Sequence, residues 1–146
     1  MTKKKLVVVL ERDSDNEWQA WSDVEDTETL LTAIAPTIEG ILQQMRELIR
    51  HFQKNEWQDV EAWRRIHPDT DIEFELAYSV LSIFDEFSFL KIGAVAKEAG
   101  MNAALLRAYA CGDKNPSEAQ AKKIEEAIRR LGQSLLNVSV VPAHAA

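Results

Sequence analysis

Residues that could contact a nucleic acid gather between positions 91 and 117. Asparagine and arginine side chains can hydrogen-bond the edges of DNA bases, and lysines can pair with phosphates. Asn102 and Arg107 lie in this region, five positions apart. Two small residues, Ala103 and Ala104, lie between them. The set also includes five polar or basic residues: Lys91, Lys97, Lys114, Asn115 and Ser117. This set predicts a DNA-contacting surface.

The spacing of apolar residues predicts three helices that would position these side chains. The first spans 91–99 and ends at Gly100, and Asn102 is placed to cap the second. Gly112 ends the second helix, and Pro116 and Ser117 open a third that runs to about residue 135. Two short helices joined by a glycine-containing turn, followed by a packing helix, are typical of a helix-turn-helix. An ordinary three-helix bundle is the alternative.

Alanine occupies most of the exposed positions expected at the start of the second helix. Only Asn102 and Arg107 carry groups that plainly read bases, and an alanine methyl contacts a thymine methyl weakly. Two interpretations therefore stay open: a helix-turn-helix that binds DNA, and one retained for packing or dimerisation. If DNA is bound, a homodimer or higher homo-oligomer is expected, because two half-sites multiply a weak affinity.

A second candidate surface is acidic and aromatic, and lies near the N-terminus. Residues 1–87 carry nine Lys and Arg against 19 Asp and Glu, a net −10, whereas 88–146 carry eight against five, a net +3. Acidic groups steer basic partners, and aromatic side chains carry interface energy. The predicted partner-binding residues are Glu11, Asp13, Asp15, Glu17, Trp18, Trp21 and Asp23. The alternative is that Trp18 belongs to the core and the acidic groups only solvate a hairpin.

Catalytic chemistry finds little support in the sequence. His51, His67 and His144 show no metal-ligand spacing with each other or with Cys111. No glycine-rich phosphate loop and no nucleophile elbow is present. We therefore expect a protein that is not an enzyme and has no cofactor or metal. No apolar run approaches a membrane span, and the single cysteine fits a reducing cytoplasm.

The remaining periodicities predict an α+β fold. Strands are expected at 6–10 and 17–22, and 29–35 is either a third strand or the start of a helix. A helix capped by Thr37 follows. The predicted organisation is an N-terminal β-β-β-α partner-binding domain (1–55), a linker (56–71), a helix-turn-helix domain (72–141) and a tail (142–146). Within the helix-turn-helix domain, a strand at 72–77 is expected to form a flanking pair with NVSVV at 137–141, either in the same chain or from a second protomer.

The stretch AVAKEAGMNAALLRAYACGDKNPSEAQAKKIEEAIRRLGQSLL resembles the C-terminal DNA-binding domain of HicB-like antitoxins, of the Cro/repressor class. VVVLERDSDNEWQAWSDVEDT, with Thr37-Ile38-Glu39 opening a helix, resembles the N-terminal domain of the same family, a truncated RNase H-like unit. The segment TLLTAIAP departs from the glycine-rich stretch that the family usually has before this helix.

The resemblance implies an antitoxin. Its N-terminal domain would neutralise a HicA-like basic ribonuclease toxin by covering the active site of the toxin. Its helix-turn-helix would bind operator DNA as a dimer and repress its own operon. The alternative is a stand-alone transcriptional regulator, or a protein-interaction module whose helix-turn-helix no longer reads DNA.

Overall fold

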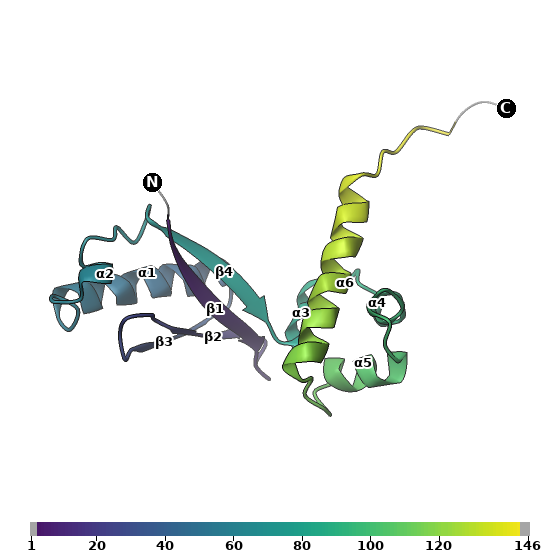
Figure 1. The fold of residues 1–146 in the computed structure, drawn as a ribbon, viewed down its shortest axis with the longest axis horizontal. Coiled ribbons are helices and arrows are strands. Elements are labelled where there is room, and N and C mark those ends of the chain that lie inside the picture. Colours follow the sequence, from purple (N-terminus) through teal and green to yellow (C-terminus); the bar gives the residue numbers. More distant parts are fainter. Residues whose placement is uncertain (1–2, 144–146) are drawn as a thin grey trace. The chain divides into compact units, whose positions relative to one another are not determined.

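The computed structural model describes residues 3–143 as an α+β protein with a four-stranded mixed sheet and six helices (Figure 1). The chain divides into two compact units, residues 1–82 and 83–146. Within the described residues, no helix is both long enough and apolar enough to cross a membrane.

The sheet of the first unit has the strand order β3-β2-β1-β4. Its strands are β1 (Lys4–Arg12), β2 (Trp18–Asp23), β3 (Leu30–Ala35) and β4 (Ile72–Tyr78). The first three form an antiparallel meander, and β4 returns to lie parallel to β1. The segment that the sequence left open between strand and helix is therefore a strand, β3.

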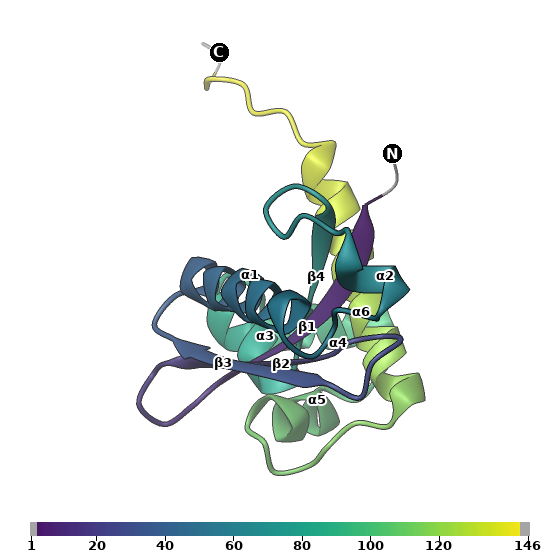
Figure 2. The same cartoon turned by 90° about the vertical axis from the view of Figure 1, so that its left-hand side faces the viewer.

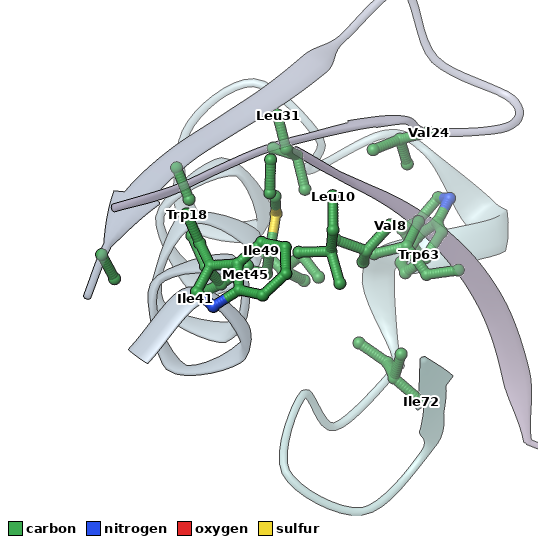
Figure 3. Close-up of a cluster of buried hydrophobic side chains, with 14 of the residues drawn as sticks. Val8, Leu10, Trp18, Val24, Leu31, Ile41, Met45, Ile49, Trp63 and Ile72 are labelled. Atoms are coloured by element: carbon green, nitrogen blue, oxygen red, sulfur yellow. The ribbon is translucent and has the colours of Figure 1, made fainter. Parts of the chain in front are cut away.

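Helix α1 (Ile38–Lys54) covers one face of this sheet, as Figure 2 shows. Strand residues alternate between buried and exposed positions, so every second side chain points at the helix. Ile41, Met45 and Ile49 of α1 fill the middle of the core (Figure 3). The strand side chains that meet them include Val8, Leu10, Trp18, Ala20, Leu31 and Ala33.

The start of α1 is fixed by the predicted cap. The Thr37 hydroxyl accepts a hydrogen bond from the Gly40 amide at 3.0 Å, which satisfies one of the free N–H groups of the first turn. A glycine at position 40 avoids close contacts, because a Cβ there would lie 3.0 Å from the Cβ of Ala35 and 3.2 Å from the Thr37 hydroxyl. The absence of a Cβ at Gly40 therefore lets α1 approach the end of β3.

The prediction that residues 56–71 form a linker is wrong. Helix α2 (Glu61–Arg64) and its flanks belong to the core of the first unit. Trp57 and Trp63 are both buried, with ring centroids 5.6 Å apart. Their indole N–H groups donate to the Thr29 hydroxyl and the Glu25 carbonyl, so both rings are buried without an unpaired donor.

The prediction that the strand at 72–77 opens the C-terminal domain is also wrong. Strand β4 pairs with β1 along its whole length, from Lys4 opposite Ile72 to Leu10 opposite Tyr78. Helix α3 (Val80–Glu86) follows at once. Its first turn is tied to β1, because the buried Ser82 hydroxyl accepts from the Arg12 amide at 3.2 Å and from the Ser79 hydroxyl at 2.9 Å.

The second unit contains three helices at the predicted places: α4 (Ile92–Ala99), α5 (Ala103–Ala110) and α6 (Glu118–Leu136). Helix α4 packs on both α5 and α6. The buried side chains come from all three helices and form a small core: Val95, Ala96, Leu106, Tyr109, Ile124 and Ala127.

The predicted strand at 137–141 does not form. Residues 138–143 have no regular secondary structure, and β4 pairs only with β1 among the described strands. The predicted flanking strand pair is therefore absent within one chain, over the residues that the structure describes, and pairing with a second protomer stays a prediction. Of the predicted tail, Pro142 and Ala143 are exposed, and 144–146 lie outside the described residues.

Candidate functional site

The turn between α4 and α5 has the backbone that its sequence predicts. Gly100 adopts the left-handed conformation, with φ of 66°, and its amide donates to the carbonyl groups that end α4. Two residues later the Asn102 side chain caps α5, because its Oδ1 accepts from the Ala104 amide at 2.7 Å. Glycine and asparagine thus determine where one helix stops and the next begins.

The residues predicted to contact DNA lie mostly on the surface of the second unit. Arg107 is exposed in the middle of α5, and Ala103 at its start is half-buried. The other seven are exposed: Lys91, Lys97, Asn102, Ala104, Lys114, Asn115 and Ser117. The side chains of Leu106 and Tyr109 point the opposite way, into the core. The structure therefore leaves eight of the nine predicted residues well exposed to solvent.

The basic side chains of this unit fall into two groups. Three of those on α6 form ion pairs, and the Arg130 guanidinium donates to both the carboxylate and the backbone carbonyl of Glu98. Arg129 and Lys122 share the Glu125 carboxylate. By contrast, the predicted phosphate-contacting residues Lys91, Lys97 and Lys114, together with Arg107, make no ion pair within residues 3–143.

Capping limits what Asn102 can do. Its carbonyl oxygen already accepts the Ala104 amide, which leaves the side-chain NH₂ as the group available to a ligand. The Ser117 hydroxyl likewise accepts from the Gln120 amide at the start of α6. Arg107 keeps all five of its N–H donors, so it is the side chain in α5 best equipped for a bidentate contact.

The acidic turn between β1 and β2 is built around Asp13. The Asp13 carboxylate accepts from the amides of Glu17 and Asp15, each at 2.9 Å, and from the Gln19 side chain. The Glu17 amide, followed by smaller contributions from Gln19 and Asp15, lowers the pKa of Asp13. Asp13 therefore holds the hairpin in shape, a role that the predicted partner-binding set did not assign to it.

The placement of Trp18 on the partner-binding surface is wrong. Trp18 is 2% exposed and meets Tyr78 edge to face in the core, with the Arg12 guanidinium 4.5 Å from its ring centroid. Because alternate strand residues face opposite sides, Trp21 lies on the other face of β2. That face carries Trp21 and Asp23, while Glu11 lies outward on the adjacent β1 and Asp15 and Glu17 lie in the turn.

Sequence reasoning missed most of the surface around Trp21. The sheet face opposite α1 (hereafter the open sheet face) presents apolar side chains from three strands: Val7, Val9, Trp21, Leu30 and Ile34. In the strand registers Val9 lies opposite Trp21 and Ala77, and Val7 lies opposite Glu75. Four exposed carboxylates share this face with the apolar side chains, as does the exposed Lys5 opposite Glu73; the carboxylates are those of Glu11, Asp23, Glu73 and Glu75. The alternation of apolar and acidic residues in 72–77 is visible in the sequence, but the strands that lie beside this segment in the sheet are not.

Within residues 3–143, no group of three His, Cys, Asp or Glu side chains is placed to hold a metal ion. Comparison with protein-family models, with curated proteins and with solved structures finds no match.

Proposed function

We propose that the protein is a DNA-binding transcriptional regulator of the antitoxin type. In this proposal α4 and α5 are the two helices of a helix-turn-helix, and α5 lies in the major groove. One observation carries it: Arg107 and the flanking lysines Lys91, Lys97 and Lys114 are exposed and make no ion pair within the described chain. An unpaired guanidinium on α5 is free to contact a base edge, and unpaired lysines beside it are free to contact phosphates.

The first unit is proposed to be the truncated RNase H-like partner-binding domain. Its support is the strand order β3-β2-β1-β4 with one face covered by α1 and the other open. An apolar centre that shares its face with four carboxylates suits a basic protein, which for an antitoxin of this type is a HicA-like ribonuclease. A protein that acts on DNA and on such an enzyme works in the cytoplasm.

DNA binding is tested with the purified protein and DNA from upstream of its own gene, measured by fluorescence anisotropy at several salt concentrations. The proposal expects binding that is tighter than to random DNA and that weakens with salt, because lysine contacts release counterions. Equal affinity for operator and random DNA at every salt concentration would leave the three helices as a packing or dimerisation module, which is the alternative function.

Partner binding is tested by co-expressing the chain with the small basic protein of a neighbouring gene. Glu75→Lys on the open sheet face is expected to abolish protection from that protein and to weaken co-purification. Glu56→Lys is the matched control, because Glu56 is exposed in the loop after α1. Protection that survives Glu75→Lys but is lost with Glu56→Lys would place the partner elsewhere on the unit.

A further inference from the structure

The end of α6 and the segment that follows it expose a run of aliphatic side chains. These side chains have relative exposures between 60% and 91%: Leu135, Leu136, Val138, Val140 and Val141. This surface is continuous along the chain, so something is expected to cover it.

Several backbone amides of this segment also have no partner in the part of the chain that the structure describes. The amides of Asn137 and Val138 bond back to the end of α6. Within the described residues, the amides of Ser139, Val140 and Val141 donate to no protein group. The sequence alternates, with Leu136, Val138 and Val140 on one side and Asn137 and Ser139 on the other, as a half-buried strand does. The segment therefore has the composition of a strand but lacks a neighbouring strand.

Strand β4 offers a matching edge. It pairs with β1 on one side only, so its other side is a sheet edge. On the face covered by α1 it presents Phe74, Leu76 and Tyr78, which remain only half-buried although they touch the core. On the open sheet face it presents Glu73 and Glu75.

The two patterns fit each other. A strand laid along β4 with Leu136, Val138 and Val140 on the α1 side would complete the burial of the half-covered aromatic and aliphatic side chains. The same register places Asn137, Ser139 and Val141 on the side of the glutamates, where the two polar side chains stay hydrated and Val141 remains exposed. An extended segment that adds to a sheet edge also gains main-chain hydrogen bonds for its free amides.

We propose that residues 136–141 of one copy of the chain add as a fifth strand to the free edge of β4 in a second copy, and that the reciprocal exchange forms the dimer. Such an exchange is closed and two-fold, because the same pair of surfaces is used twice. The inference deepens the proposed function, since it names the surface of the dimer that DNA binding requires. It is nevertheless measured without DNA, so failure of DNA binding and failure of this pairing are distinguishable.

The first test is the mass in solution by light scattering. The full chain is expected to be a dimer, and the double substitution V138D/V140D a monomer with an unchanged circular dichroism spectrum, because both side chains are exposed in the isolated chain. The matched control is Lys122→Asp with Lys123→Asp, also exposed, which should stay dimeric. A wild-type monomer, or a dimer that survives the two aspartates, would overturn the proposal.

The second test identifies the partner edge. In a Cys111→Ser background, a tagged chain with Glu75→Cys is mixed with an untagged chain with Ser139→Cys and treated with a short bismaleimide. The expected product is a cross-link between the tagged and the untagged chain. For a chain that carries both substitutions, the yield of cross-linked product should fall as excess cysteine-free chain is added. Subunit exchange then pairs each substituted chain with a chain that has no cysteine. Three outcomes would overturn the assignment to β4. These are no product, a product that joins only untagged chains to each other, and a product of monomer mass whose yield does not fall when cysteine-free chain is added.

Discussion

In the proposed function, Arg107 is the side chain on which DNA reading would depend most directly. Its guanidinium is exposed in α5 and keeps its full set of donors, whereas the neighbouring exposed positions are mainly alanine. Arg107→Ala is expected to weaken binding to upstream DNA by about 10- to 100-fold, the effect of losing one base contact. Arg129→Ala is the control, because Arg129 is exposed but paired with Glu125. Equal losses for both variants would mean that Arg107 acts only as a surface charge.

Asp71 provides a residue-scale prediction about pH. Its carboxylate accepts from the His67 amide at 2.8 Å and from the Thr70 hydroxyl, and these bonds lower its pKa below the ordinary 3.8. A lowered folded-state pKa stabilises the fold above the ordinary pKa, and this contribution is lost as pH falls through the folded-state value.

Asp71→Asn should therefore unfold at a lower urea concentration than the wild type at pH 7, and the difference should vanish at pH values below the folded-state pKa of Asp71. Asp59→Asn is the control, because Asp59 is exposed and makes no hydrogen bond within residues 3–143. A difference between wild type and Asp71→Asn that stays constant from pH 7 down to acid pH would contradict the linkage.

Helix ends show most clearly what local sequence determines. Gly100 has φ of 66°, a conformation that disfavours any residue with a Cβ, so Gly100→Ala is expected to lower the free energy of unfolding by about 1 kcal/mol. Gly93 lies inside α4, where an added Cβ meets nothing within 4 Å. Gly93→Ala should therefore raise it by roughly 0.5 kcal/mol. Calorimetry on both variants measures these opposite signs, and a shared sign would refute the cap.

Local signals were enough to predict helices α1, α4, α5 and α6. The caps Thr37, Asn102 and Ser117 and the stop at Gly100 each act within three or four residues, and the structure places all of them as expected. The alternation in β2 implies that Trp18 and Trp21 lie on opposite faces of the sheet. The alternation alone does not determine which of the two faces α1 covers. For this reason Trp18 was predicted to lie on the surface, as Trp21 was.

Pairing between distant segments was not readable from the sequence. Strand β4 pairs with β1 across more than 60 intervening residues, and parallel pairing leaves no turn signal between the partners. The stretch that looked like a polar linker carries Trp57 and Trp63, whose burial depends on the hairpin that closes over them. Residues 137–141 have strand composition, but a strand also needs a neighbour, and composition does not supply one.

At the scale of the whole molecule the two units differ in the size of their cores. Among the described residues, fifteen buried hydrophobic side chains form the core of the first unit and six are buried in the second. All four tryptophans lie in the first unit, at 18, 21, 57 and 63. Tryptophan fluorescence therefore reports the unfolding of the first unit alone, whereas circular dichroism reports helices of both.

In urea the helical signal should begin to fall at a lower concentration than the tryptophan signal, because the smaller core of the second unit stabilises it less. Superimposable transitions from the two probes would show that the units unfold together. The V138D/V140D variant is useful here as well, since a monomer separates the stability of the units from that of the dimer.

The central claim is that a dimer reads DNA through α5, and a footprint on DNA from upstream of the gene tests it most directly. We expect two protected half-sites about one helical turn, or roughly 34 Å, apart, weakened by added salt and lost with Arg107→Ala but kept with Arg129→Ala. Absence of protection, or uniform protection that ignores the substitution, would contradict the claim and leave the open sheet face as the functional surface of the protein.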